Sequence, residues 1–310
     1  MLRWLFTYVK EHEDLDLHIG RNSDIQWISV YRGLTRIIRV YTTTKSGTIK
    51  VDADKKYRDI SPELFGKKQL SELSEVLLEA IRKSLEDEGD KDSRYNNRKE
   101  GYYQNEISRK LGLCSGEDSD FVIIDKEAVV GYEDEEEKSR IYKPIRQGYE
   151  ELKRKLSEID SKKYGSKLGE KSIGNELDFL ALDKNGDILL IEFKHGTNIS
   201  GIYLSPLQIG LYYDIFSMPQ LNATLPQAIT RMLDQKQRIG LINPDWKMPK
   251  LSGRIIPVLI VSYPNSKGSA KSKLESVLEI CRKEKGNVFL KDFRIYSYTS
   301  EDGLRQWATL

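Results

Sequence analysis

The chain has 310 residues, a formal net charge of +2 and 32% charged residues. This length allows two domains, or one large domain with an added module. Because the net charge is close to zero, composition argues neither for nor against a nucleic-acid partner, and any attraction to phosphates has to come from local patches. Cys114 and Cys281 are far apart and lack CxxC spacing, which is typical of a reducing cytoplasm and excludes a cysteine-rich zinc site.

No apolar run approaches the roughly 20 residues of a membrane span. The apolar opening, Met1–Phe6, is short and is soon followed by acidic residues, so a signal peptide is not expected. We therefore expect a cytoplasmic protein without a membrane partner.

Residues 1–120 are predicted to form an α/β module of unknown role. Strands are expected over 35–42 and 48–52. Leucine and isoleucine residues three and four apart predict a helix over 69–86. The polar stretch that follows, 86–101, is predicted to be a surface loop.

Residues 121–310 are predicted to form the second domain. One or two short strands are expected over 121–131, and the acidic run 133–137 is predicted to be a solvated connection. A helix is expected over 143–159. Its buried stripe is predicted to consist of Ile145, Tyr149, Leu152, Leu156 and Ile159.

The rest of the second domain begins with a hairpin at 174–194. Ser205 and Pro206 have the pattern of an N-cap followed by proline at the first helical position, which predicts a helix ending near 217. The later elements are expected to be a helix at 225–239, a strand at 255–262, a helix at 269–284 and a strand at 293–299. Right-handed crossovers would then give a mixed sheet with helices on both faces.

The hairpin carries the most informative residues. Its loop contains Gly186, which can take the positive φ of a tight connection. If Asn185 is the midpoint, Asp178 lies across from Glu192, with Cβ atoms roughly 5 Å apart. The same register places Glu176 across from Lys194, and the strand period of two puts all four side chains on one otherwise apolar face.

Two carboxylates at the end of an apolar face repel each other and are costly to desolvate unless a cation compensates them. A divalent metal ion is one such cation, and the Lys194 ammonium is the other. The simpler alternatives are a half-exposed hairpin with polar ends, and a salt bridge between Lys194 and Glu176.

Asp178 followed by Glu192-Phe193-Lys194 resembles the D-(x)n-(D/E)-x-K signature of the PD-(D/E)XK nuclease superfamily. Gln208 and Tyr212 are similar to the Q-x-x-x-Y motif of its helicase-associated exonuclease and CRISPR adaptation branch. The resemblance covers residues 143–300 and implies a restriction-endonuclease-like fold, a mixed central sheet flanked by helices. Leu177 stands where that family often has proline.

The resemblance also implies roles for these residues. Asp178, Glu192 and the backbone carbonyl of Phe193 would hold Mg²⁺ or Mn²⁺, since these ions prefer oxygen ligands. Lys194 would orient the attacking water and stabilise the charge of the transition state. Gln208 and Tyr212 would line the active site, unless they are only a buried polar pair that packs the helix on the sheet.

The family usually adds an acidic residue on the first core helix of the domain. Here Glu150 and Glu151 are expected to face away from the core. Glu170 and Glu176 are substitutes, of which Glu176 shares the face of Asp178, so one or two metal ions remain possible. His195 is expected to point to the opposite face from Lys194.

Substrate binding requires cations, because phosphate contacts dominate affinity. Between Arg94 and Lys110, basic residues alternate with tyrosines that could stack on bases or simply anchor a loop. The candidates in the second domain, each of which could instead be a plain solvated residue, are Lys162, Lys163, Lys167, Arg231, Lys236 and Arg238.

Together with the resemblance, these features predict a Mg²⁺- or Mn²⁺-dependent deoxyribonuclease, acting in bacterial or phage DNA processing or in anti-phage defence. The resemblance implies that its products carry 5′-phosphates. The N-terminal module is expected to select the substrate or a protein partner, and a homodimer would cut both strands. The alternative is a nuclease-like subunit that binds nucleic acid or a partner and is active only within a larger complex.

Overall fold

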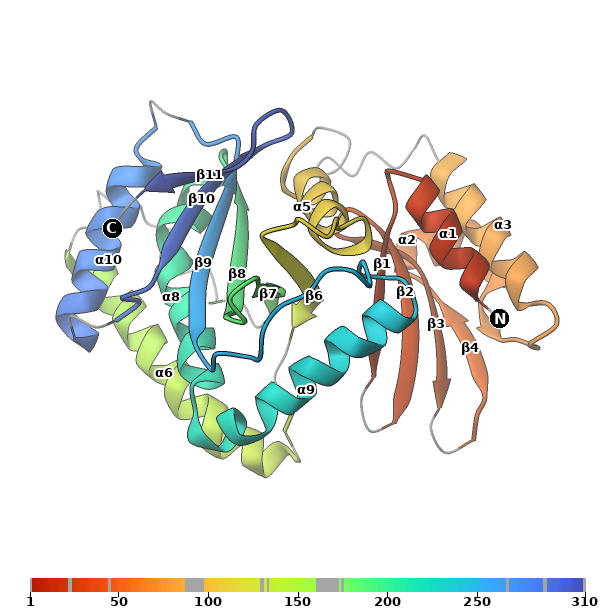
Figure 1. The fold of residues 1–310 in the computed structure, drawn as a ribbon, viewed down its shortest axis with the longest axis horizontal. Helices are drawn as coiled ribbons and strands as arrows, with labels where there is room; N and C mark the ends of the chain where they lie inside the picture. Colours follow the sequence, from red (N-terminus) through yellow and green to blue (C-terminus); the bar gives the residue numbers. More distant parts are fainter. Residues whose placement is uncertain are drawn as a thin grey trace. The chain divides into compact units, whose positions relative to one another are not determined.

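A computed structural model of the chain describes residues 2–21, 24–43, 46–86, 98–128, 131–132, 134–159, 173, 176–265, 268–286 and 289–308 (Figure 1). The chain divides into two compact units, one of residues 1–119 with 236–246 and one of residues 120–235 with 247–310. The return of 236–246 to the first unit is not indicated by the sequence. It follows from packing, because Leu241 lies in the first unit's core and the Trp246 indole donates to the Ser119 carbonyl at 2.8 Å.

The first unit is built on an antiparallel five-stranded sheet in the order β1-β2-β3-β4-β5. Its elements are α1 (Arg3–Glu11), β1 (Asp16–Arg21), β2 (Ile25–Arg32), β3 (Thr35–Thr43), β4 (Ile49–Asp52), α2 (Lys55–Ile60), η1 (Pro62–Leu64), β5 (Gly66–Lys67), α3 (Leu73–Glu86), α5 (Glu100–Ser108) and η2 (Arg109–Leu113). Strands β1 and β2 were not predicted from the sequence. One sheet face is apolar and shares a buried core with α1 and α3.

The segment Arg94–Lys110, in which tyrosines and cations were predicted to meet a nucleic acid, is largely helical where it is described. Arg94 and Tyr95 lie outside the described residues. Tyr103 is buried, so it anchors the helix to the unit. Arg109 is also buried, and its guanidinium donates to the carbonyls of Val9 (2.7 Å), Lys10 (2.9 Å) and Leu15.

Two of those acceptors, Val9 and Lys10, lie in the last turn of α1, whose carbonyls have no partner within the helix. Arg109 therefore closes the C-terminal end of α1. Of the two alternatives for this segment, the structural one applies to Arg109, because its guanidinium donates to backbone oxygens.

The second unit has a six-stranded mixed sheet in the order β11-β10-β9-β8-β7-β6. Strands β8, β9 and β10 run parallel, and the other neighbours are antiparallel. The elements are β6 (Phe121–Ala128), α6 (Glu135–Ile159), β7 (Leu177–Asp183), β8 (Ile188–His195), α8 (Ile199–Phe216), α9 (Pro219–Arg238, which ends in the first unit), β9 (Ile255–Ser262), α10 (Ala270–Lys285), β10 (Arg294–Thr299) and β11 (Gly303–Ala308). The chain is thus α/β, with two sheets and flanking helices.

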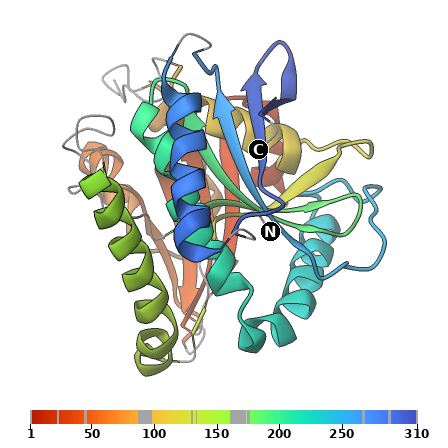
Figure 2. The same ribbon diagram turned by 90° about the vertical axis from the view of Figure 1, so that its left-hand side faces the viewer.

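Three helices of the second unit, α6, α8 and α10, pack as one group on the sheet (Figure 2). Helices on both faces were expected, and these three cover one of them. Both crossovers, β8 to β9 and β9 to β10, step across the sheet in the same direction, and crossovers of one hand then place their helices on the same side.

Helix α6 begins earlier than predicted, at Glu135, and includes most of the acidic run 133–137. The Asp134 carboxylate accepts from the Glu137 amide at 2.7 Å, and Glu135, Glu136 and Glu137 form the first turn. Carboxylates are favourable there because they face the positive end of the helix dipole. The acidic residues are therefore a helix start rather than a connection.

Helix α8 also begins earlier, at Ile199, with Asn198 accepting from the Gly201 amide at 3.0 Å. Ser205 and Pro206 are therefore inside the helix and do not start it. Proline has no N–H to donate to the carbonyl four residues back, that of Ile202. The Ser205 hydroxyl donates to this carbonyl instead, at 2.8 Å, which explains how the helix continues through proline.

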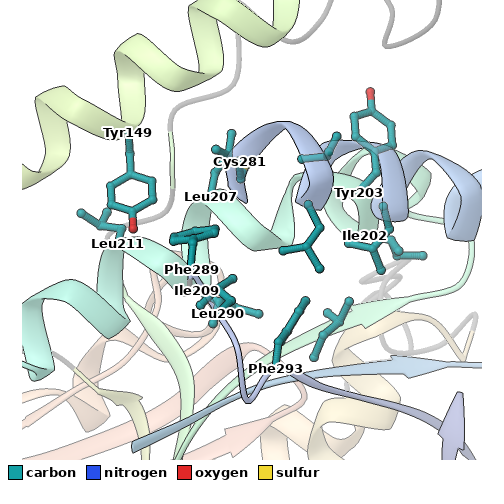
Figure 3. Packing of buried hydrophobic residues seen from close by; sticks show 14 of the residues in the cluster. Tyr149, Ile202, Tyr203, Leu207, Ile209, Leu211, Cys281, Phe289, Leu290 and Phe293 are labelled. Atoms are coloured by element: carbon teal, nitrogen blue, oxygen red, sulfur yellow. The ribbon is translucent and has the colours of Figure 1, made fainter. Parts of the chain in front are cut away.

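Cys281 on α10 is buried among the apolar residues that join the three helices to the sheet (Figure 3). Burial raises the pKa of its thiol from 9.0 to about 12. Between these two pH values the unfolded chain releases a proton that the folded chain keeps. The contribution of this thiol to stability is therefore present below pH 9 and is lost as the pH rises toward 12.

We expect one thiol, that of the exposed Cys114, to react with a disulfide reagent in the native protein near pH 8, and two thiols to react after unfolding in guanidinium. The measurement is the absorbance of the released thiolate. Rapid reaction of both thiols in the native protein would contradict the buried position of Cys281.

Candidate active site

The candidate site is built on the hairpin of β7 and β8, whose register is the predicted one. Phe179 pairs with Ile191 and Leu182 with Ile188, so the hairpin is centred on Asn185. Gly186 has φ +80°, and a Cβ there would lie 2.6 Å from the Lys250 carbonyl oxygen. Glycine is thus required by both the turn and the neighbouring chain.

Three oxygen atoms converge on the ammonium of Lys194. Its Nζ lies 3.4 Å from Asp178 Oδ2 and 2.9 Å from the Phe193 carbonyl oxygen, and it also donates to Glu192 Oε1. Asp178 Oδ2 is held in turn by the Phe193 amide at 2.8 Å. The two carboxylates and the carbonyl that the resemblance implies as metal ligands therefore surround a single cationic atom.

Burial makes these contacts strong. Glu192 has 0% of its side chain exposed, Lys194 11% and Asp178 22%. On the neighbouring strand Glu192 pairs with Leu259 and Lys194 with Val261, both in the core beneath α8 and α10. An ionised carboxylate in such surroundings is stable only with a close opposite charge, which the ammonium supplies.

Helix α8 brings Tyr212 to the carboxylates. Burial raises the pKa of its hydroxyl well above the usual range, and the charges of Glu192 and Asp178 raise it further. The hydroxyl is buried and makes no hydrogen bond to any described residue. Gln208, one turn earlier in α8, is half-buried, and no described contact joins it to the carboxylates.

Glu176 does not occupy the position expected for it. Strand β7 begins at Leu177, so Glu176 is just outside the hairpin and exposed. Lys194 forms ion pairs with Asp178 and Glu192. Partial burial raises the pKa of Glu176, and the charges of Glu127 and Asp178 act in the same direction.

Glu127 is a nearby carboxylate that sequence reasoning missed. On β6, Lys126 pairs with Phe179 and Ala128 with Leu177, which places Glu127 beside Asp178. Its backbone has φ +50°, a left-handed conformation that is uncommon for glutamate. Glu127 and Asp178 lie on strands that are far apart in the sequence. No local sequence pattern therefore predicts that they are neighbours, and only the pairing of β6 with β7 shows it.

The remaining acidic candidates lie away from the site. On α6, Glu150 pairs with Lys153 at 3.5 Å and Arg146 at 3.9 Å, and Glu151 is exposed, which fits the expected outward direction. Glu170 lies outside the described residues. The His195 ring contacts the Thr197 hydroxyl at 2.8 Å.

The cations predicted to bind substrate are only partly placed. Lys162, Lys163 and Lys167 lie outside the described residues. Arg231 on α9 is exposed and donates to Gln227 of its own helix. Lys236 and Arg238 belong to the first unit, so assigning them to the nuclease half is wrong.

The donor set suits a small divalent ion. Mg²⁺ is commonly held by one or two carboxylates and completes its shell with water and phosphate. Asp178, Glu192 and the Phe193 carbonyl supply such a set, although no group of three or more His, Cys, Asp or Glu side chains suited to a metal is found within the described ranges. Because the Lys194 ammonium lies among the same oxygens, it would have to withdraw to admit an ion.

Comparisons with protein-family models, with curated proteins and with solved structures found no match to this chain. Among the described helices, none has the length and apolar character needed to cross a membrane.

We expect Lys194→Met to lower the free energy of unfolding in EDTA by about 3 kcal/mol or more, because Glu192 loses its buried counter-ion. Mg²⁺ at ten times its Kd should then restore about 1.4 kcal/mol. Urea unfolding followed by circular dichroism measures both effects. The control is Lys184→Met, at an exposed position in the hairpin loop.

The wild-type protein should gain less from Mg²⁺ than the Lys194→Met variant, since the ammonium competes for the same oxygens. Equal stabilisation of both proteins, or of neither, would show that these oxygens do not bind the ion.

Proposed function

We propose that the second unit is a metal-dependent nuclease of the PD-(D/E)XK, restriction-endonuclease-like class and that it hydrolyses DNA phosphodiester bonds. One observation carries the proposal: Asp178 Oδ2, Glu192 Oε1 and the Phe193 carbonyl gather around one cation, the Lys194 ammonium. A mixed sheet with crossover helices packed on one face supports it.

The residues would divide the chemistry as follows. Asp178, Glu192 and the Phe193 carbonyl would hold Mg²⁺ or Mn²⁺, which when bound supplies charge neutralisation at the phosphate and a more acidic water. Lys194 is flexible and carries three donors, so it can turn from the carboxylates toward a phosphate oxygen or the attacking water. Its charge then offsets the negative charge that develops on the phosphorus oxygens.

Tyr212 is suited to positioning rather than to proton transfer. Burial and two carboxylates raise the pKa of its hydroxyl, which therefore stays protonated and can donate to a substrate oxygen or to water. The hydrolysis itself adds a water oxygen to phosphorus and breaks the bond to the 3′ oxygen, which takes up a proton. This leaves the 5′-phosphate.

A second candidate function is a nuclease-like subunit that binds nucleic acid or a partner without cutting. The ion pairs of Lys194 favour it, because the ammonium already neutralises Asp178 and Glu192 without any metal. In that case the cluster would be a stabilising element of the core.

Activity assays on the purified full-length chain separate the two functions. Linear, circular and single-stranded DNA and RNA would be incubated with Mg²⁺ or Mn²⁺. We expect Asp178→Asn, Glu192→Gln and Lys194→Met each to lower the cleavage rate by at least about 100-fold, the usual effect of losing a group that stabilises transition-state charge.

The matched control is Glu150→Gln on α6, which should keep the wild-type rate because Glu150 pairs with Arg146 and Lys153. Cleavage that survives Asp178→Asn would contradict the proposed site. Absence of cleavage by the folded wild-type chain on every substrate would favour the binding subunit.

A further inference from the structure

One face of the five-stranded sheet in the first unit carries aromatic rings and cations instead of apolar side chains. Strand pairing places Trp27 opposite Tyr41, Tyr41 opposite Lys50 and Lys50 opposite Lys67. Arg39 lies two residues from Tyr41 and shares its face. We call Trp27, Arg39, Tyr41, Lys50 and Lys67 the basic sheet face; Lys67 is exposed and the other four are half-buried.

The other face of the same sheet is apolar and packs against α1 and α3. Residues that alternate with the basic sheet face, including Ile28, Val40 and Val51, belong to the core beneath α1 and α3. An antiparallel sheet with one packed face usually presents ordinary polar residues on the other. Packing of the core does not explain why Trp27 and Tyr41 lie on the face away from it.

The rings and the guanidinium form a stacked arrangement. The Trp27 indole lies against Gly20 on the neighbouring strand, where an added Cβ would come within 2.3 Å of a ring carbon. The Arg39 guanidinium carbon lies 4.5 Å from the Trp27 ring centroid and 5.7 Å from that of Tyr41. Glycine at position 20 therefore leaves room for the indole, and the Arg39 guanidinium lies close to both rings.

The positive charge on this face is balanced only in part, by Asp52, which lies opposite Arg39 and acts to raise the pKa of Arg39. No described carboxylate forms an ion pair with Arg39, and its buried Nε has no hydrogen-bond partner among the described residues. Its cross-strand neighbour Asp52 pairs with Arg58 instead, at 3.3 Å. Burial lowers the pKa of Arg39, and the charge of Arg36 lowers it further.

Lys50 and Lys67 add to this charge, since they are directly opposite each other on adjacent strands. Like charges in this position are destabilising unless an anion compensates them. Three cations and two rings on one face thus suit a polyanion that also has flat groups.

We propose that the basic sheet face binds single-stranded nucleic acid, with bases stacking on Trp27, Tyr41 and the Arg39 guanidinium and with phosphates on Lys50 and Lys67. Aromatic rings and arginine planes stack on unpaired bases with little regard to sequence. A duplex hides its base faces, and an acidic peptide has no rings to stack, so neither uses this surface fully.

The dimensions agree with a short strand. Strands in a sheet are about 4.8 Å apart, so β2 to β5 spans roughly 14 Å. A sheet surface of this width holds roughly two or three stacked bases. The proposal does not depend on hydrolysis by the second unit, because all of these residues belong to the first.

The test uses the full-length Asp178→Asn protein, so that binding is measured without cleavage. Fluorescence anisotropy follows a labelled oligothymidylate of about 20 nucleotides, longer than the roughly 4–16 nucleotides of single-strand sites, with oligouridylate as a second probe. Variants are Arg39→Gln, Tyr41→Ala and Tyr41→Phe. Lys10→Gln, at an exposed position on α1, is the control for an equal loss of charge.

We expect Arg39→Gln and Tyr41→Ala each to weaken binding by about 10-fold, the usual effect of removing one stacking contact. Tyr41→Phe and Lys10→Gln should bind like the parent protein, and urea unfolding should confirm that each variant is folded. An unlabelled duplex of the same length and polyglutamate should compete poorly.

Unchanged binding by Arg39→Gln, or equal competition by duplex or polyglutamate, would overturn the proposal. These outcomes are independent of nuclease activity. A chain that binds through Arg39 but never cleaves would refute the proposed nuclease alone, and a chain that cleaves without Arg39-dependent binding would refute the basic sheet face alone.

Discussion

The arrangement of the second unit depends on one buried charge interaction, between the Lys194 ammonium and the carboxylates of Glu192 and Asp178. Glu192 is fully buried, and an isolated carboxylate there would cost several kcal/mol. Strand β8 carries both partners two residues apart, so the charge and its compensation share one face of the sheet. The ion pairs that stabilise the fold therefore also place the oxygens of Asp178, Glu192 and the Phe193 carbonyl around one cation.

Helices α8 and α10 cover the face of the sheet that carries Glu192 and Lys194. Because the two parallel crossovers place α8 and α10 on the same face, apolar side chains exclude water from the inner end of the cluster. Burial, and after it the charges of Glu192 and Asp178, raise the pKa of the Tyr212 hydroxyl on α8. Asp178, the most exposed member, is left on the side from which a substrate could approach.

The first unit uses its sheet differently. Its apolar face builds a core with α1 and α3, whereas the opposite face gathers two rings and three cations, with the carboxylate of Asp52 beside Arg39. The buried guanidinium of Arg109 donates to backbone carbonyls of α1. A basic residue in a segment rich in tyrosine therefore does not by itself indicate a nucleic-acid site. The Arg39 guanidinium, by contrast, lies over the rings of Trp27 and Tyr41, and its buried Nε has no hydrogen-bond partner among the described residues.

The sequence by itself determined the hairpin register, because a loop centred on Asn185 and a side-chain period of two place Asp178, Glu192 and Lys194 together by local geometry. It also located β9 and the outward direction of Glu150. The start of α8 was predicted at Ser205 and Pro206, but these residues lie inside the helix. There the Ser205 hydroxyl donates to the carbonyl of Ile202, which Pro206 cannot do because it has no N–H. Only the tertiary structure decided that Glu127 lies beside Asp178 and Trp27 beside Arg39, because these neighbours come from separate strands whose pairing no local pattern encodes.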